Sequence, residues 1–294
     1  MATQQTRTLA RVMAAPSVIL LFLWMIVPLA MTLYFSTLRY SLLDADAAHF
    51  VGLTNYGYFL SDPNFITALV NTLILVGAVL AISVGGGMLV ALLMDQQIFG
   101  RPIVRLMVIA PFFVMPTVSA LVWKNLLMNP VSGLFAWIAK SAGLPAVDWF
   151  TNYPMISVII IVAWQWLPFA SLILLTALQS LDGEQKEAAL LDGAKSFDFF
   201  YHITLPHVAR AMTVVVLIET IFLLSVFAEI LVTTNGGPGT ATTNLPYEIY
   251  LTMFRKYEYG EAAAAGVVVV IGTIIVATFA LRTISSLFNE EVST

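Results

Sequence analysis

Residues 183–195 contain one acid at the head of an otherwise apolar helical face. Glu187, Leu190, Leu191 and Ala194 follow the i, i+3, i+4, i+7 spacing that places side chains on one side of a helix. Such a face suits docking, because the carboxylate can pair with a cation while the aliphatic groups are buried against a partner protein. The alternative is an amphipathic helix that lies in the membrane interface.

The ends of this helix are also encoded locally. Asp182 can cap its first turn, with Gln185 completing a capping box, and Gly193 is suited to the left-handed turn that follows a helix. Ser196 can cap a second short helix. Pro206 lacks an N–H and fits the start of the next helix.

The composition shows what surrounds this segment. The chain has 294 residues, of which 60% are hydrophobic and only 10% charged. Soluble domains carry about 25% charged residues, so the sequence predicts a polytopic membrane protein. No basic field for nucleic acid is present. Cysteine is absent and the three histidines lie far apart or in loops, so no metal site is expected.

Apolar runs of the ~20 residues needed to cross a bilayer occur six times. The first is too long for a cleaved signal peptide. The sequence therefore predicts an all-α fold with one transmembrane domain over residues 1–294 and a cytoplasmic loop at 178–206. The predicted spans are 13–37, 66–94, 103–127, 154–177, 207–233 and 262–288.

The basic residues predict the orientation of these spans. With the N-terminus in the cytoplasm, eight of the 13 Lys and Arg residues fall on the cytoplasmic side. Both termini and the loop at 178–206 are then cytoplasmic.

The loop at 187–206 resembles the EAA loop of ABC importer permeases. The family pattern is E-A-A, three residues, G, nine residues, I-x-L-P, and the chain matches it without a gap at Glu187, Ala188, Ala189, Gly193, Ile203, Leu205 and Pro206. The resemblance implies the type I importer permease fold, with residues 183–195 as a coupling helix that inserts into a cleft of a cytoplasmic ATPase. The implied coupling residues are these seven together with Leu190, Leu191 and Ala194.

A second stretch narrows the resemblance. Asn235, Gly236, Gly237 and Pro238 require a turn by their chemistry alone. With Phe227, Glu229 and Ile230 before the turn and Tyr247, Ile249, Tyr250 and Phe254 after it, the stretch resembles carbohydrate-type permeases. Glu229 replaces the family's usual Asp, and Phe227 is offset by one residue, which leaves the sugar class open. Within that class the chain looks most like permeases for sugar alcohols such as sorbitol or mannitol.

The resemblance also implies partners. No G-x-x-x-x-G-K-[ST] pattern occurs, so ATP and Mg²⁺ are expected on other polypeptides, and this chain is expected to be a non-catalytic subunit without a cofactor of its own. The expected partners are two ATP-binding subunits, a second homologous permease and a periplasmic solute-binding protein. The expected location is the bacterial inner membrane.

Polar side chains within the apolar runs are candidates for the solute path. Carbohydrate sites combine aromatic faces with amide and carboxylate groups, and intramembrane polar groups usually face a cavity or a partner helix. The alternative is that these groups hydrogen-bond between helices. The candidates are Asn71, Gln165 between Trp164 and Trp166, and Ser225 with Glu229, which would share a helical face.

Two other functions are considered. An ion-coupled secondary carrier could use Glu219 and Glu229 as relays, but it would not require an EAA loop. An ABC permease for a non-carbohydrate solute is the second alternative. A membrane-embedded enzyme is disfavoured, because no H-E-x-x-H or G-x-S-x-G motif occurs.

Overall fold

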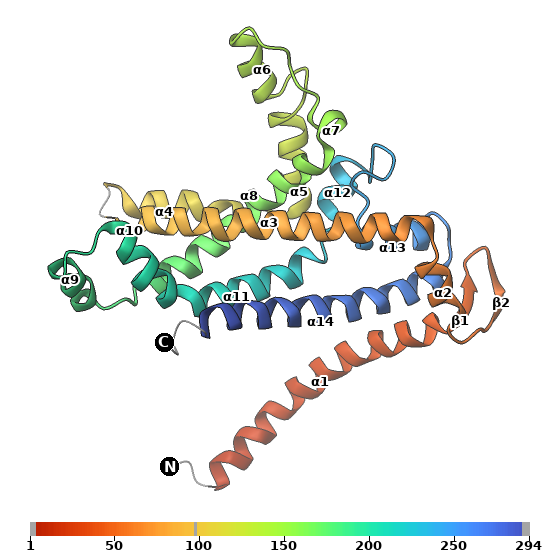
Figure 1. Ribbon diagram of the computed structural model, residues 1–294. Coiled ribbons are helices and arrows are strands. Elements are labelled where there is room, and N and C mark those ends of the chain that lie inside the picture. Colours follow the sequence, from red (N-terminus) through yellow and green to blue (C-terminus); the bar gives the residue numbers. More distant parts are fainter. Residues whose placement is uncertain (1–3, 97–98, 290–294) are drawn as a thin grey trace. The chain divides into compact units, whose positions relative to one another are not determined.

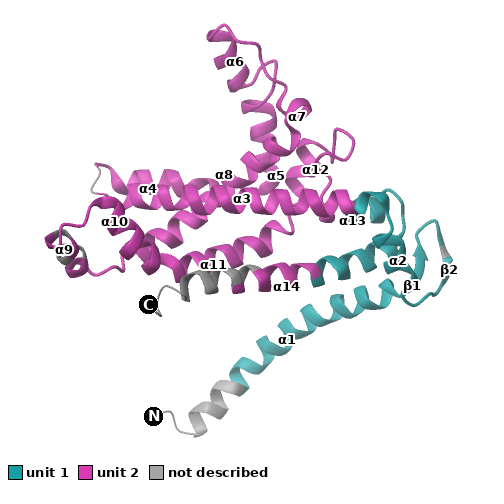
Figure 2. Ribbon diagram, in the orientation of Figure 1, with its two compact units in different colours: residues 1–65, 249–271 teal, residues 66–248, 272–294 magenta. Residues whose placement is uncertain are grey.

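The computed structural model describes residues 4–96 and 99–289. Within these ranges the side chains of residues 4–11, 45, 47, 186–188, 190, 280–281 and 283–289 lie outside the description. The described chain is mainly helical and divides into two compact units, residues 1–65 with 249–271 and residues 66–248 with 272–294 (Figure 2).

The long helices follow the apolar runs. They are α1 (Gln4–Ser36), α3 (Pro63–Asp95), α8 (Pro154–Leu178), α11 (Leu205–Leu223) and α14 (Tyr259–Asn289) (Figure 1). The shorter helices are α2 (Thr54–Leu60), α4 (Arg101–Ile109), α5 (Pro116–Val122), α6 (Leu134–Ser141), α7 (Trp149–Asn152), α9 (Gly183–Leu191), α10 (Ser196–Phe199), α12 (Ala228–Thr233) and α13 (Leu245–Phe254). A 3₁₀ turn, η1 (Ala110–Phe113), and two π-helical turns, η2 (Trp123–Leu127) and η3 (Phe200–Thr204), complete the helical elements of the described chain.

Five helices of the described chain are long and apolar enough to cross a membrane, and a sixth span is possible as a bent pair. The run at 103–127, predicted as one helix, is this pair: residues 101–113 and 116–127 meet at 104°. Val114 and Met115 are extended, with ψ of 130° and 138°, because Pro116 disfavours helical geometry in the residue before it. The fifth predicted span is also interrupted, since α11 ends at Leu223 and α12 begins only at Ala228.

Unit 1 contains a β-hairpin that the all-α prediction missed. Strands β1 (Leu38–Ser41) and β2 (Asp44–Phe50) are antiparallel and pair Leu38 with Phe50. Buried Asn55 of α2 donates to the Ser36 and Leu38 carbonyls, each at 2.8 Å, and so anchors the hairpin to the end of α1. Local sequence does not reveal this hairpin, because its pairing depends on these tertiary contacts.

Unit 2 is built around α3, α8 and α11. Its core contains the buried residues Met88, Ala91, Met94, Leu174, Leu175, Leu178 and Val208. Gly87 of α3 permits close packing of α3 on α8, because a Cβ there would lie 2.7 Å from the Ala170 Cβ of α8. Residues 128–153, with α6 and α7, project from the rest of unit 2 (Figure 1).

Candidate functional site

The loop between α8 and α11 forms the helix that its sequence predicts. Asp182 Oδ1 accepts a hydrogen bond of 3.0 Å from the Glu184 amide at the start of α9. Gly193 has φ +80°, as predicted, and the Ala194 amide donates to the Ala189 carbonyl at 3.0 Å. This 6→1 bond around a left-handed glycine closes the helix as a Schellman motif.

The described residues of the predicted docking face differ in exposure. Leu191 is 88% exposed, and Ala194 is partly buried. Ala189 is 8% exposed and lines the cavity described below. The side chains of Glu187, Ala188 and Leu190 lie outside the described residues. The described part of α9 therefore exposes Leu191 and buries Ala189.

The second half of the loop differs from the prediction in one place. Ser196 is the first residue of α10 and not its cap, and the Lys195 amide donates to the Asp198 carboxylate at 3.3 Å. Pro206 is the second residue of α11, near the predicted helix start, although α10, η3 and α11 follow one another as one span over Ser196–Leu223. The π-helical turn η3 ends at Thr204, within one turn of the proline, which has no N–H to donate to an α-helical hydrogen bond. Ile203 and Leu205 are partly buried beside it.

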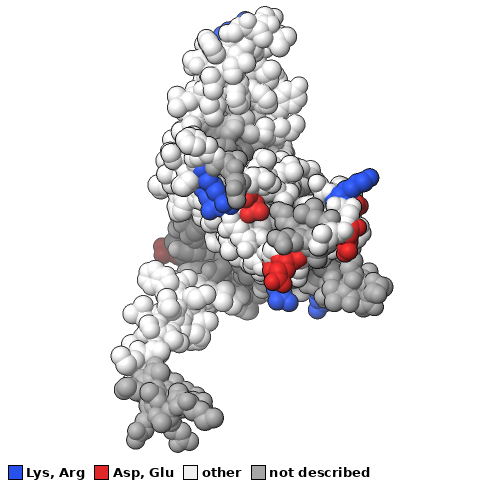
Figure 3. All heavy atoms as spheres, turned by 90° about the vertical axis from the view of Figure 1, so that its left-hand side faces the viewer, with Lys and Arg blue, Asp and Glu red and all other residues white. Residues whose placement is uncertain are grey.

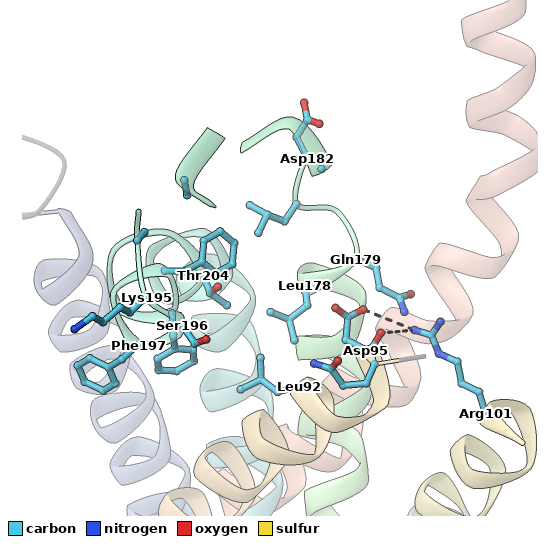
Figure 4. Close-up of a pocket in the computed structure, with 17 residues that line it drawn as sticks. Leu92, Asp95, Arg101, Leu178, Gln179, Asp182, Lys195, Ser196, Phe197 and Thr204 are labelled. Atoms are coloured by element: carbon cyan, nitrogen blue, oxygen red, sulfur yellow. Dashed lines mark hydrogen bonds and ion pairs between the residues drawn. The ribbon is translucent and has the colours of Figure 1, made fainter. Parts of the chain in front are cut away.

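A cavity of about 1110 Å³ lies behind this loop (Figure 4). One wall is formed by residues of the loop between α8 and α11, namely Asp182, Gly183, Ala189, Ala194, Lys195, Ser196, Phe197, Phe199, Phe200 and Thr204. The other wall is formed by Leu92, Asp95, Gln96, Arg101, Leu178, Gln179 and Leu181. Both acidic and basic side chains lie on this face of the molecule (Figure 3). The loop thus leaves a hollow between itself and the ends of α3 and α8.

A polar network stabilises the membrane-side wall of this cavity. Arg101 Nη2 lies 3.7 Å from the Asp95 carboxylate, and Arg101 Nε donates to the Met94 carbonyl at 3.0 Å. With its amide oxygen turned toward the arginines, Gln179 accepts from Arg101 and Arg105 at 3.0 and 2.6 Å. This network was not predicted, although a basic residue directly after a transmembrane run is a recognisable signal.

Residues 13–289 match the family model described as the binding-protein-dependent transport system inner membrane component. The chain belongs to this family. It is therefore a transport subunit of an importer and a multi-pass membrane protein.

Related proteins and a solved structure agree with this assignment. The permease is 33% identical to a probable ABC transporter permease protein of Sinorhizobium fredii, over 85% of its own length and 81% of the relative's. It is also 33% identical to the trehalose/maltose transport system permease protein of Thermococcus litoralis, over 79% and 78% of the two chains. A chain in the crystal structure of a bacterial ABC transporter involved in the import of the acidic polysaccharide alginate has the same fold, with a TM-score of 0.78, 23% identity and 96% of each chain covered.

The polar side chains proposed for the solute path form bonds within the permease. Gln165 is 6% exposed and donates from Nε2 to the Val114 carbonyl at 2.6 Å. Asn71 donates to the Thr240 and Thr243 carbonyls, each at 2.9 Å. Both therefore bridge elements of unit 2, as the alternative interpretation expected. Trp166 packs edge-on against Phe112, whereas Trp164 is 36% exposed.

Ser225 and Glu229 do not share a helical face, so that part of the prediction is wrong. Ser225 lies in the break between α11 and α12 and is exposed, whereas Glu229 lies in the first turn of α12 and is 4% exposed. The i, i+4 rule fails here because the helix does not continue through residues 224–227.

Two polar contacts in the same unit were not predicted. The buried Ser83 hydroxyl of α3 donates to the buried Glu219 carboxylate of α11. Lys124 Nζ donates to the Val232 and Thr233 carbonyls at 2.9 and 2.8 Å, which places a cation at the C-terminal end of α12. Each contact joins residues more than 100 positions apart, so the local sequence does not indicate the partner.

The predicted turn at Asn235–Pro238 is present and tightly packed. Asn235 and Gly236 have φ of +52° and +83°, and Asn235 Oδ1 accepts a 2.6 Å hydrogen bond from the Tyr247 hydroxyl. A Cβ on Gly236 would lie 2.6 Å from the Tyr247 ring. The turn is therefore a fixed part of unit 2. Among the described residues, no group of three or more His, Asp or Glu side chains could hold a metal ion.

Proposed function

We propose that this chain is a permease subunit of an ATP-driven importer that carries a carbohydrate or sugar alcohol into a bacterial cell. The observation that carries the proposal is α9, which is capped by Asp182, is followed by the left-handed Gly193 and exposes Leu191. An exposed leucine beside a matched EAA pattern suits insertion into a cleft of an ATPase subunit. Two such subunits would supply ATP and Mg²⁺ binding.

The same proposal assigns the sides of the membrane. Eight of the 13 basic residues lie on the side of α9 if both termini are cytoplasmic. The β-hairpin and the turn at 235–238 then face the periplasm, where a solute-binding protein delivers the solute. A second homologous permease would complete the passage, since the described polar side chains of unit 2 are mostly bonded within this chain.

The substrate class is supported by two observations. The trehalose/maltose permease is similar over most of its length, and the alginate importer shares the fold. The Gly-Gly-Pro stretch and the later tyrosines resemble carbohydrate-type permeases, with sorbitol or mannitol as the favoured solutes.

The test is reconstitution of the permease with its partner permease, ATPase subunits and binding protein in proteoliposomes. We expect uptake of labelled sorbitol, mannitol or maltose that requires ATP, the ATPase subunits and the binding protein. Uptake driven by a proton or sodium gradient without the ATPases would instead support a secondary carrier. ATP-driven uptake of an amino acid alone would contradict the carbohydrate assignment.

A further inference from the structure

We propose that the cavity behind α9 is a regulatory site for the transported solute, and that solute bound there from the cytoplasm inhibits the importer. This inference rests on the proposed function for the identity of the solute. It concerns a different part of the chain from the solute path.

The size of the cavity suits a small organic ligand. Its volume of about 1110 Å³ is slightly above the ~300–1,000 Å³ that is typical of ligand pockets. It can hold a hexitol or a disaccharide together with water. All of its lining residues belong to unit 2, so both walls are part of one compact body.

The charges on the walls favour a neutral ligand. Among the described lining residues two are acidic and two are basic, namely Asp95, Asp182, Arg101 and Lys195, and their formal charges cancel. Asp95 and Arg101 already form an ion pair with each other. The other acid and base carry opposite charges, so the described lining as a whole favours neither an anionic nor a cationic ligand.

The remaining lining groups match the chemistry of a polyhydroxylated ligand. Gln96, Ser196 and Thr204 supply amide and hydroxyl groups that can donate to and accept from sugar hydroxyls. Phe197 is 74% exposed and stacks on Tyr201 with a ring distance of 6.4 Å and an angle of 10°. Because Phe197 lines the cavity and is largely exposed, its ring can pack against the C–H surface of a sugar.

The position of the cavity explains why binding would inhibit. One wall is the loop with α9 and α10, and the opposite wall is formed by the ends of α3 and α8 with Arg101 (Figure 4). A ligand that contacts both walls stabilises the arrangement in which they are close. It therefore opposes any step of the ATPase cycle in which the loop moves relative to the membrane domain.

The test measures the ATPase rate of the complete importer in nanodiscs, which leave both membrane faces accessible. Sorbitol, mannitol and maltose are titrated separately from micromolar to about 100 mM with the binding protein at constant concentration. We expect the rate to rise as the binding protein fills and then to fall at millimolar concentrations. The increase in ATPase rate tests the proposed function, and the decrease at higher solute concentration tests the regulatory site.

Two variants test whether the decrease in ATPase rate arises from ligand binding in this cavity. Gln96→Trp fills the cavity from the end of α3, and Phe197→Ala removes the aromatic face. We expect both to keep the rise and to shift the falling phase to solute concentrations about tenfold higher. Phe113→Ala, which removes an equally exposed aromatic side chain outside the cavity, should leave the whole curve unchanged.

Each result bears on one claim. If the wild-type ATPase rate increases with solute but does not decrease at higher concentration, the regulatory site is contradicted and the proposed function stands. A decrease that is unchanged in both cavity variants also contradicts the regulatory site, because the inhibitory site then lies elsewhere. If none of the three solutes raises the ATPase rate, the proposed substrate class is contradicted. In that case a decrease of the basal ATPase rate at high solute concentration, abolished in both cavity variants, still supports the regulatory site.

Discussion

Gln165 of α8 donates a 2.6 Å hydrogen bond to the carbonyl of Val114, at the point where the third span breaks. The break removes the helical partner of this carbonyl, and the glutamine replaces it. The side chain that looked like a solute ligand in the sequence therefore stabilises a bent span.

We expect Gln165→Leu to lower stability more than it lowers solute recognition. Loss of an interhelical hydrogen bond in a membrane protein costs about 0.6 kcal/mol on average, and an unsatisfied buried carbonyl raises the cost to ~1–2 kcal/mol. The loss of stability is measured by thermal unfolding in detergent. Thr176→Val, on the exposed side of α8, is the control. Wild-type stability together with a weakened affinity for the solute would return Gln165 to the solute path.

Gly193 and Gly183 form a matched pair for testing the end of α9. Neither would place a new Cβ within 4 Å of another atom, but only Gly193 has a left-handed φ, of +80°. Gly193→Val should therefore strain the turn by ~1–2 kcal/mol and reduce transport and stimulated ATPase activity, while Gly183→Ala remains near wild type. Insertion into the membrane should be normal in both. Full activity of Gly193→Val combined with Glu187→Lys would refute the coupling role of this loop.

Gly236 and Gly239 separate backbone strain from steric overlap in the 235–239 turn. Both have positive φ, but a Cβ on Gly236 meets the Tyr247 ring at 2.6 Å, whereas one on Gly239 meets nothing within 4 Å. Gly236→Ala should cost ~1–3 kcal/mol more than Gly239→Ala in thermal unfolding. Equal losses would show that the ring of Tyr247 moves aside freely.

The ion pair of Asp62 with Lys256 predicts that the stability of unit 1 depends on pH. Burial alone would raise the pKa of Asp62. Hydrogen bonds from the Asn64 amide at 2.8 Å and from Lys256 Nζ at 3.0 Å, with the charge of Lys256, lower this pKa below its ordinary value. A lowered folded-state pKa contributes stability above the unfolded value of about 3.9, and this contribution is lost as the pH falls through the folded value.

The measurement is the difference in melting temperature between the wild type and Asp62→Asn. We expect a constant difference from pH 7 to pH 5 and a decline below pH 4. A difference that is already lost at pH 5 would contradict a lowered pKa.

The sequence predicted those features that depend on neighbouring residues. The apolar runs placed the long helices, and Gly193 marked the end of α9, because helix length and a left-handed turn are local properties. The resemblance of the EAA loop supplied the family without any tertiary information.

Features that depend on distant partners were not predicted. The break at residues 224–227 separates Ser225 from Glu229, although no proline marks it. The hairpin at 38–50 depends on Asn55, and the cavity behind α9 depends on where Arg101 and Gln179 meet. Periodicity identifies which residues share a face only while one helix continues.

Docking of α9 into an ATPase subunit can be tested directly by cysteine cross-linking. The chain contains no cysteine, so a single thiol introduced by Leu191→Cys, at a position 88% exposed, reports on this site alone. A short bis-maleimide reagent should join Leu191→Cys to an ATPase subunit in the assembled importer, whereas Phe50→Cys in the hairpin, with 72% exposure, should give no such product. Absence of a cross-link from Leu191→Cys, or an equal yield from Phe50→Cys, would contradict the account.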